Sequence, residues 1–253
     1  MQVEERPYVL TIAGHDPSGG AGLNADIKAM EAIGVQGLSI CTSVTYQTED
    51  TFEGVSWIGK KQIKKQLVPI LERYKIDYVK IGIIRDPDVL LWLVRSLKDY
   101  HPHIFIIWDP VLSTSTGFRI QQRLKPRAVK AILEYVDLIT PNWHEIAVLS
   151  KKRDPFKAAR HLSKYCSVYL KGGHNEAEKG IDYLWAEGTE NAFVPEFVSA
   201  YEKHGSGCVF SAALISYLSL AYTLDSACVA AKRYVAEYLD SSEQLLGIHY
   251  QML

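Results

Sequence analysis

The sequence contains little cysteine, no long apolar run and almost no net charge. Only four of its 253 residues are cysteines, and they show neither a C-x-x-C pair nor a metal-ligand spacing. This excludes a disulfide-rich fold and a cysteine-ligated zinc site. No apolar stretch is long enough to span a bilayer, and the net charge is −1. Neither a membrane protein nor a nucleic-acid-binding protein with a broad basic face is therefore expected.

The chain also lacks a secretory signal and a Walker A loop. The opening residues, "MQVEERPYVL", are charged and have no apolar core, which predicts a cytoplasmic protein with free thiols. The segment 54–61, "GVSWIGKK", satisfies G-x-x-x-x-G-K but ends in lysine where a Walker A loop needs Ser or Thr to hold magnesium. Its bulky, β-prone interior is unsuited to wrapping phosphates. The lysines that follow, in "GKKQIKKQL", are predicted to form the solvated side of an amphipathic helix.

What the sequence does contain is a regular alternation of short β-rich runs and helical patterns. Strands are predicted near residues 8–14, 38–46, 77–84, 104–108, 138–140 and 167–173, and helices near 21–34, 60–74, 86–100, 125–136, from 141 or 142, and 156–166. The alternation predicts a mainly parallel sheet with helices on both faces, a three-layer α/β/α sandwich formed by one domain over residues 1–253. A hairpin over 181–198 and two helices, from Gly207 and near Asp225, complete it.

Ligands of an open parallel sheet bind beyond the carboxyl ends of its strands, and the first such segment here is rich in glycine. The stretch Gly14–Asp26, "GHDPSGGAGLNAD", is typical either of a phosphate cradle or of a tight turn with glycines for helix packing. Within it, Asp26 lies beside the inward stripe of Leu23, Ile27 and Met30. A carboxylate so close to the core needs a partner, which a polar ligand would supply.

Three further strand ends carry residues suited to a nucleotide and a metal. Asn142 and Glu145 are spaced as a helix-capping box; alternatively both face the strand ends, where Glu145 could hold Mg²⁺ and phosphates could bind. Asp109 follows "IFIIW" and points to the same edge, although an aspartate before proline also forms turns. Lys171 ends an apolar strand and precedes two glycines, which favours a lysine that reaches an anion over one that extends into solvent.

The stretch "HGSGC" places four consecutive backbone N–H groups, Gly205 to Cys208, at the start of a helix that is apolar nearly all round. Such a helix is buried, so its dipole and its unpaired amides are suited to an anion. We expect Gly205, Ser206 and Gly207 to form an anion hole for a transferred phosphoryl group. Because a helix N-terminus lowers a thiol's pKa, Cys208 is expected to be thiolate enough to accept a proton.

These segments resemble, in the same order, those of the hydroxymethylpyrimidine/phosphomethylpyrimidine kinases. The stretches concerned are "TIAGHDPSGGAGLNADIKA", "VTYQ", "VKIG", "DPV", "ITPNWHE", "LKGGH" and "HGSGCVFSAAL". That family belongs to the ribokinase-like superfamily, together with the pyridoxal kinases. The resemblance implies a ribokinase-like fold and an ATP-dependent kinase of thiamin biosynthesis. Its substrate would be 4-amino-5-hydroxymethyl-2-methylpyrimidine and also the resulting monophosphate. Relatives are commonly dimers, so a homodimer is expected.

The resemblance also assigns roles to individual residues. The substrate contacts of the family fall on Gly14, Asp26, Gln47 and Val111, with Ile83 lining the same pocket. The nucleotide contacts fall on Asn142, Glu145, Lys171 and the loop Gly205–Gly207, and the magnesium contacts on Asp109 and Glu145. Cys208 occupies the position of the catalytic base, where ribokinase-type relatives carry aspartate and this family carries cysteine.

Three departures from the family pattern bear on the substrate. Ser206 replaces the usual threonine of the Gly-Thr-Gly-Cys loop and keeps its hydroxyl. Ile83 replaces a methionine that commonly lines the pyrimidine pocket, which makes the pocket stiffer. Glu202 and Lys203 replace the Asn-Thr that precedes the loop's histidine, so contacts on the adenine side or with a lid are expected to differ.

Two alternatives to the pyrimidine kinase remain at this point. A pyridoxine or pyridoxal kinase would phosphorylate a similarly flat N-heterocycle that bears a CH₂OH group. A catalytically silent protein that binds a vitamin precursor or a nucleotide belongs to another class, and the retained Cys208, Glu145 and Lys171 argue against it. Comparison of kcat/KM for the two substrates, and calorimetry without ATP consumption, would distinguish these alternatives.

Overall fold

The computed structural model describes residues 6–112, 124–174 and 178–251, which form a nine-stranded sheet in the order β3-β2-β1-β4-β5-β6-β7-β8-β9. Six central strands are parallel: β2 (Gln36–Gln47), β1 (Tyr8–His15), β4 (Tyr78–Ile81), β5 (Phe105–Trp108), β6 (Leu138–Ile139) and β7 (Ser167–Leu170). Three outer strands take part in antiparallel pairs: β3 (Phe52–Trp57) at one end of the sheet, and β8 (Asp182–Ala186) and β9 (Thr189–Phe193) at the other. The predicted mainly parallel sheet is thus confirmed.

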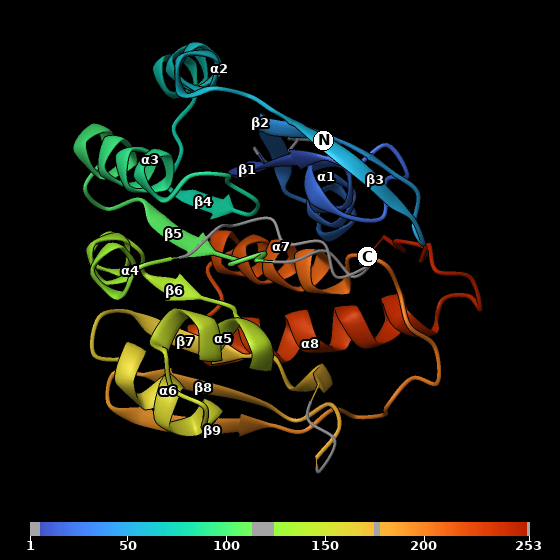
Figure 1. The fold of residues 1–253 in the computed structure, drawn as a ribbon. Helices are drawn as coiled ribbons and strands as arrows, with labels where there is room; N and C mark the ends of the chain where they lie inside the picture. The colour runs from blue at the N-terminus through green and yellow to red at the C-terminus, as the bar shows by residue number, and fades with distance from the viewer. Residues whose placement is uncertain (1–5, 113–123, 175–177, 252–253) are drawn as a thin grey trace.

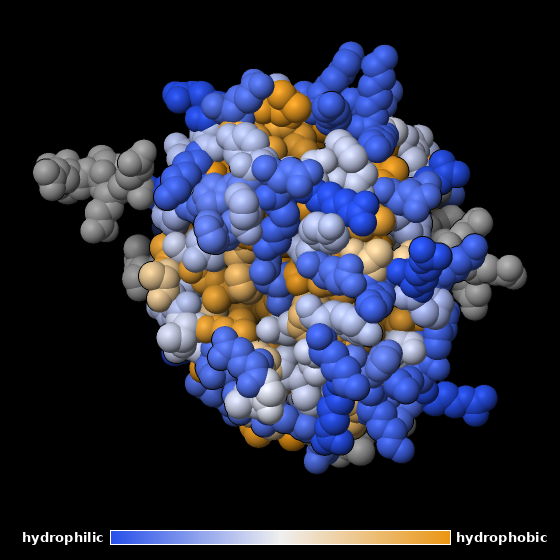
Figure 2. All heavy atoms as spheres, turned by 90° about the vertical axis from the view of Figure 1, so that its left-hand side faces the viewer, coloured by the Kyte–Doolittle hydropathy of each residue, from blue (hydrophilic) through white to orange (hydrophobic). Residues whose placement is uncertain are grey.

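Helices cover both faces of the sheet, as the three-layer prediction requires (Figure 1). One face packs against α1 (Gly22–Ile33), α7 (Ser206–Ser219) and α8 (Leu224–Asp240). The other packs against α2 (Lys60–Arg73), α3 (Pro87–Tyr100), α4 (Pro126–Leu133), α5 (Trp143–Ser150) and α6 (Pro155–Leu162). Figure 2 views the side that carries α2, α3 and α4, where polar side chains cover most of the surface.

Burial explains why the central elements read as continuous apolar runs. All residues of β1 except the two at its ends are buried, because a parallel strand is covered on both faces. Helix α7 lies between the sheet and α8, and every residue from Val209 to Leu218 is buried. Its all-round apolar sequence is therefore a consequence of packing on all sides. In the described ranges, no helix has the length and apolarity needed to cross a membrane.

Strand β3 was not predicted, and the predicted hairpin was found. The excluded segment 54–61 contributes the end of β3 and the N-cap of α2, Gly59. Strand β3 lies at the sheet edge and is paired on one side only, so its alternation of buried and exposed residues is weak. Strands β8 and β9 form the expected hairpin, and its turn residues Glu187 and Gly188 both have positive φ, as tight hairpin turns require.

Candidate active site

The carboxyl ends of the parallel strands bring most of the expected site residues to one edge of the sheet. Gly14 lies near the end of β1 and Gln47 ends β2, while Asp109 directly follows β5. Lys171 follows β7, and its N–H donates to the Pro141 carbonyl 3.0 Å away, just before Asn142. The start of α7 reaches the same edge, because Gly207 in its first turn lies beside Lys171.

The centre of the site is an ion pair between Asp109 and Lys171. Lys171 Nζ lies 2.8 Å from Asp109 Oδ1, and the two side chains are 17% and 2% exposed. Asp109 also accepts hydrogen bonds from the Thr140 hydroxyl at 3.1 Å and from the Ser211 hydroxyl of α7 at 3.2 Å. Burial opposes the charge of Lys171, but Asp109 and Glu145 outweigh it, so that the pKa of Lys171 is raised. The ammonium is a fixed cation with one open side.

Glu145 forms the capping box that its spacing allowed, and it also faces this ion pair. Its Oε2 accepts from the Asn142 N–H at 2.8 Å, while Asn142 Oδ1 accepts from the Glu145 N–H at 2.9 Å. Burial raises the pKa of Glu145 to about 7, against the attraction of Lys171 and with the help of Asp109. The capping-box interpretation of the Asn142–Glu145 spacing is therefore confirmed, and Glu145 is in addition buried within electrostatic reach of Asp109 and Lys171.

The loop before α7 lies against Lys171 on one side and against the β1–α1 loop on the other. Gly205 is the N-cap of α7 and has φ 73°, a conformation that favours glycine. A Cβ at Gly207 would lie 3.1 Å from Lys171 Nζ, so the ammonium stands directly beside the loop. The N-terminal amides of α7 and a fixed cation thus share one place, which is suited to phosphate oxygens.

Cys208 lies in the first turn of α7, but its thiol is not activated as expected. Burial raises the pKa of Cys208 to about 11, although Lys80 and the Gly22 N–H act in the opposite direction. The expectation that the helix N-terminus would make Cys208 a thiolate is therefore wrong for the protein without ligands, because desolvation of the thiol outweighs the helix end. The thiol still lies between the N-termini of α7 and α1, since it interacts with Gly22.

Asp26 finds its partner inside the protein. Its carboxylate lies 2.8 Å from Lys80 Nζ and 2.5 Å from the Thr11 hydroxyl, and both charged side chains are fully buried. Burial opposes the charge of Lys80, but Asp26 raises the pKa of Lys80 further, so that the lysine stays charged. We expected a polar ligand to be the partner of the Asp26 carboxylate, but this ion pair shows that its partner is Lys80. The signal that could have revealed it was a lysine inside the apolar strand "YVKI".

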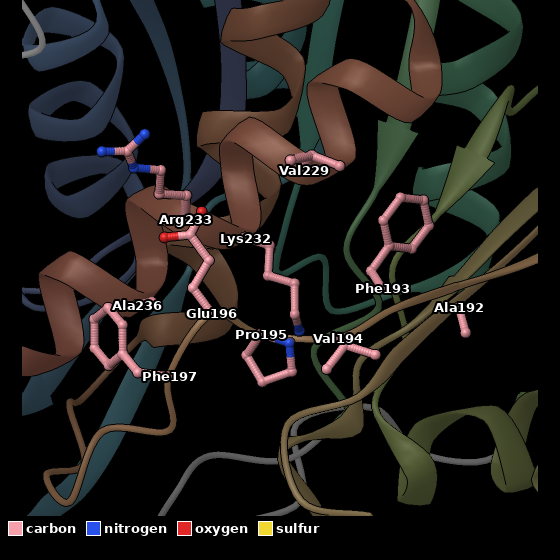
Figure 3. A pocket seen from close by; sticks show the side chains of 10 residues that line it. All are labelled: Ala192, Phe193, Val194, Pro195, Glu196, Phe197, Val229, Lys232, Arg233 and Ala236. Atoms are coloured by element: carbon pink, nitrogen blue, oxygen red, sulfur yellow. The ribbon is translucent and has the colours of Figure 1, made fainter.

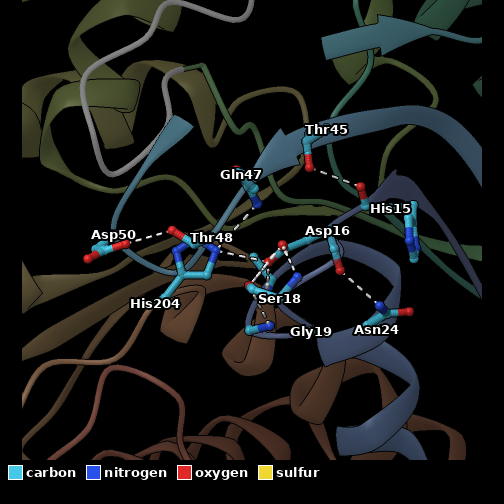
Figure 4. A network of polar contacts seen from close by, with 12 residues as sticks. His15, Asp16, Ser18, Gly19, Asn24, Thr45, Gln47, Thr48, Asp50 and His204 are labelled. Carbon is cyan, nitrogen blue, oxygen red and sulfur yellow. Dashed lines mark hydrogen bonds and ion pairs between the residues drawn. The ribbon is translucent and has the colours of Figure 1, made fainter. Parts of the chain in front are cut away.

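Gln47 joins a polar network between the β1–α1 loop and the loop before α7 (Figure 4). Its Nε2 lies 3.5 Å from His204 Nε2, which in turn lies 2.9 Å from Asp16 Oδ2. Burial opposes the charge of Asp16, but hydrogen bonds from His204, Gln47 and Ser18 outweigh it and hold its pKa well below the usual range. His204 and Asp16 were not among the expected site residues.

Gly14 and Ile83 are adjacent, as expected for residues that line one pocket. A Cβ at Gly14 would lie 2.8 Å from Ile83 Cγ2 and 2.5 Å from Ser43 Oγ. Ser43 is fully buried, and its hydroxyl has no hydrogen-bond partner within the described part of the chain. Val111 is half-buried next to Asp109, whose carbonyl accepts from the Val111 N–H at 2.9 Å.

A groove lies between α8 and the segment that follows β9 (Figure 3). Its volume is about 200 Å³, and it is lined by Ala192, Phe193, Val194, Pro195, Glu196, Phe197, Val229, Lys232, Arg233 and Ala236. The carboxyl end of β9 opens into it, so it belongs to the same edge of the sheet as Lys171.

Lys203, one of the departures from the family pattern, is buried, and its ammonium donates to the Ser242 carbonyl. This residue therefore anchors the C-terminal segment.

Comparison with known proteins gives a consistent result. The family model described as phosphomethylpyrimidine kinase matches residues 16–252. A relative named hydroxymethylpyrimidine/phosphomethylpyrimidine kinase, from Escherichia coli, is 32% identical over 83% of this chain and 82% of its own length. Two other curated relatives are much longer, and the chain spans only 50% and 34% of their lengths.

Solved structures extend the comparison to the fold. The crystal structure of phosphomethylpyrimidine kinase from Clostridium difficile is 30% identical, has a TM-score of 0.77, and is matched over 92% of this chain and 99% of that one. The pyridoxal kinase from Staphylococcus aureus in complex with ADP is 25% identical, has a TM-score of 0.80, and is matched over 94% and 89%. These neighbours confirm the ribokinase-like architecture.

Proposed function

The chain belongs to the phosphomethylpyrimidine kinase family, and from this premise we propose that it transfers the γ-phosphoryl group of ATP to the hydroxymethyl group of 4-amino-5-hydroxymethyl-2-methylpyrimidine. The resulting monophosphate is a second substrate, so that the product is the pyrophosphate used in thiamin biosynthesis. The observation that carries the proposal is the Lys171 ammonium beside Gly207 at the N-terminus of α7. Fixed donors at this place stabilise charge on phosphate oxygens as it develops.

The pyrimidine is proposed to bind between the β1–α1 loop and the ends of β2 and β4. Gly14, Ile83 and Val111 would contact its ring, and a side chain at Gly14 would crowd this place, because its Cβ would lie 2.8 Å from Ile83 Cγ2. The amide of Gln47 can both donate and accept, which suits an aminopyrimidine. Asp26 is proposed to support the pyrimidine site from inside the protein, because its carboxylate is fully buried against Lys80.

Asp109 and Glu145 are the residues proposed to hold Mg²⁺. Their carboxylates face Lys171 together, and the raised pKa of Glu145 reflects its burial near Asp109, so a further cation fits this donor set. In the parts of the chain that the structure describes, no group of three or more His, Cys, Asp or Glu side chains is arranged to hold a metal. Mg²⁺ commonly binds through one or two carboxylates and substrate phosphates, and when bound it would neutralise phosphate charge.

Cys208 is proposed to receive the hydroxyl proton of the substrate late in the transfer. The pKa of about 11 means that Cys208 is a protonated thiol before substrates bind, so it must first release that proton to solvent, and only the resulting thiolate can accept the hydroxyl proton. In a loose phosphoryl-transfer transition state the attacking hydroxyl is still largely protonated, and little basicity is needed early. The amides of Gly205, Ser206 and Gly207 would hold the γ-phosphoryl oxygens meanwhile.

The groove between α8 and segment 192–197 is proposed to receive the adenine of ATP. Val194, Phe197 and Val229 offer apolar walls to a flat base, and the segment continues toward the loop before α7. Asn142, Glu145 and Lys171 would then contact the phosphates from the strand ends. Apolar walls with a few polar groups are typical of small-molecule sites.

A product assay tests the proposal directly. We expect the purified protein, with ATP and Mg²⁺, to convert hydroxymethylpyrimidine first to the monophosphate and then to the pyrophosphate. Chromatography of the products follows the two steps. If hydroxymethylpyrimidine stays unphosphorylated while another alcohol is turned over, the substrate assignment falls. Calorimetry that shows ligand binding without ATP consumption would instead indicate a silent binding protein.

Pyridoxal kinase is the second candidate, because the ADP complex of the Staphylococcus aureus enzyme is as similar in fold as the pyrimidine kinase structure. We expect kcat/KM to be higher for hydroxymethylpyrimidine than for pyridoxal or pyridoxine when the three are measured side by side. The reverse order would make vitamin B6 salvage the function.

We further propose a homodimer in the cytoplasm. The cysteines Cys41, Cys166, Cys208 and Cys228 are all free, as a reducing compartment requires. Light scattering after gel filtration should give twice the chain mass of 28.5 kDa, and cell fractionation should recover the protein with cytosolic markers.

A further inference from the structure

The β1–α1 loop and the loop before α7 are joined by a hydrogen-bonded histidine–aspartate pair to which the proposed chemistry assigns no role. His204 Nε2 lies 2.9 Å from Asp16 Oδ2, and the two side chains are only 9% and 3% exposed. Figure 4 shows that the Nε2 end of the imidazole faces both Asp16 and Gln47. Charged and polar groups buried to this degree are retained only where they are paired.

Asp16 also organises its own loop. Its carboxylate accepts from the Ser18 N–H and hydroxyl, each at 2.9 Å, and from the Ala21 N–H at 2.8 Å. These bonds fix the chain just before α1. The bond to His204 is the one that crosses to the other loop, so it links the start of α1 to the start of α7.

The backbones of the two loops are in direct contact at the same place. A Cβ at Gly20 would lie 2.7 Å from His204 Cδ2, and a Cβ at Gly205 would overlap the Gly20 carbonyl oxygen. Neither position has room for a side chain. The C-terminal segment also holds His204 in place, because the backbone N–H of His204 donates to the Leu245 carbonyl at 2.9 Å.

We propose that the His204–Asp16 pair is a clasp that sets the distance between the acceptor alcohol and the transferred phosphoryl group. The clasp rests on the proposed function: the β1–α1 loop and Gln47 hold the alcohol substrate, and the amides of Gly205–Gly207 hold the phosphoryl group. His204 touches neither reacting group, so it is a positioning residue.

The expected effect is on turnover rather than on substrate binding. Phosphoryl transfer needs the two reacting atoms in line and close together, and a misplacement of about 1 Å can cost about 10²-fold in rate. Each substrate keeps its own contacts when the clasp opens, so the KM values stay nearly unchanged. Loss of kcat with constant KM is the signature of misplacement.

The test uses His204→Ala, Asp16→Asn and the double variant, with kcat and both KM values measured on folded protein. We expect each single variant to lower kcat by about 10- to 100-fold and to leave KM within about threefold. The double variant should be no worse than either single one, because residues that act as one unit are not additive. His204→Gln, whose amide can approach the Nε2 position, should recover part of the loss.

Lys98→Met is the matched control. Lys98 Nζ lies 2.8 Å from Asp137, with the two side chains 20% and 33% exposed. Asp137 directly precedes β6, at the amino ends of the parallel strands and away from the site. This variant removes a partly buried ion pair without touching either loop. We expect a lower melting temperature and an unchanged kcat, whereas His204→Ala should lower kcat even at temperatures well below its melting temperature.

Hydrogen exchange separates the clasp from the proposed function. The backbone amides of residue 204 and of Val209, which donate to the Leu245 and Gly205 carbonyls, should exchange at least tenfold faster in His204→Ala than in the wild type, and at an unchanged rate in Lys98→Met. If the wild type phosphorylates no pyrimidine, the proposed function fails while faster exchange still supports the clasp. Unchanged exchange together with unchanged kcat in His204→Ala, or additive losses in the double variant, would overturn the clasp.

Discussion

Two lysines, Lys80 inside β4 and Lys171 just after β7, each form an ion pair with an aspartate, but their surroundings differ. Lys80 is fully buried against Asp26, while Lys171 is 17% exposed and stands beside Gly207. The first pair has no open side, and the second leaves part of its cation available to a ligand. The comparison suggests that Lys80 holds the interior of the site in place and that Lys171 acts on the substrate.

The largest expected effect is on stability. Lys80→Met leaves the Asp26 carboxylate buried without its cation, which typically costs about 3–5 kcal/mol of unfolding free energy. Urea unfolding should show this loss, and the double variant Lys80→Met, Asp26→Leu should recover most of it, because it buries no unpaired charge. Lys171→Met should lose much less stability, since Asp109 keeps Thr140 and Ser211 as partners. Equal losses for the two lysines would remove the distinction.

Lys171→Met tests the other half of the comparison. Removal of one preorganised donor to a developing charge typically lowers the rate by about 10²–10³-fold. We expect a loss of this size in kcat/KM with ATP, in a protein that remains folded by circular dichroism. Lys171→Arg should restore little, because the room beside Gly207 is tight: a Cβ there would already lie 3.1 Å from Nζ. Activity close to wild type in Lys171→Met would make the lysine structural.

A smaller effect is expected at Cys208. General base catalysis contributes about 10²–10⁴-fold, and a thiol with a pKa of about 11 should give the low end of that range. We therefore expect Cys208→Ala to lower kcat by about 10²-fold, whereas Cys208→Asp keeps substantial activity. Pre-steady-state measurement of the transfer step is the appropriate readout. An unchanged rate in Cys208→Ala would leave only the loop amides as contributors.

The difference between the two lysines also shows what the sequence could predict. Lys171 and Asp109 were predicted because they directly follow strands, and Glu145 because it lies at the start of a helix that follows one; strand order alone places such residues at one edge. Lys80 was not assigned, because its partner Asp26 lies 54 residues away and only the packed structure brings them together.

Burial explains the failed expectation at Cys208. The helix N-terminus was visible in the sequence, but the desolvation of the thiol was not, and desolvation determines the direction of its pKa shift. Strand β3 was missed for a related reason. Its pattern depends on the one neighbour it pairs with, β2, and an edge strand shows less of the apolar continuity that marked the central strands.

The pH dependence of stability is the smallest effect that tests the comparison of the two lysines. It concerns Lys171 alone, because Glu145 interacts with that lysine. The pKa of Glu145 is raised to about 7 from 4.5, so between these values the folded protein holds a proton that the unfolded chain releases. Stability therefore falls as the pH rises through this window. Without Mg²⁺, urea unfolding from pH 4.5 to 8 should show a decline of up to about 3 kcal/mol from this group. Glu145→Gln keeps the helix cap and should remove the decline. An identical pH profile for the two proteins would show that burial does not raise the pKa of Glu145 in the folded protein.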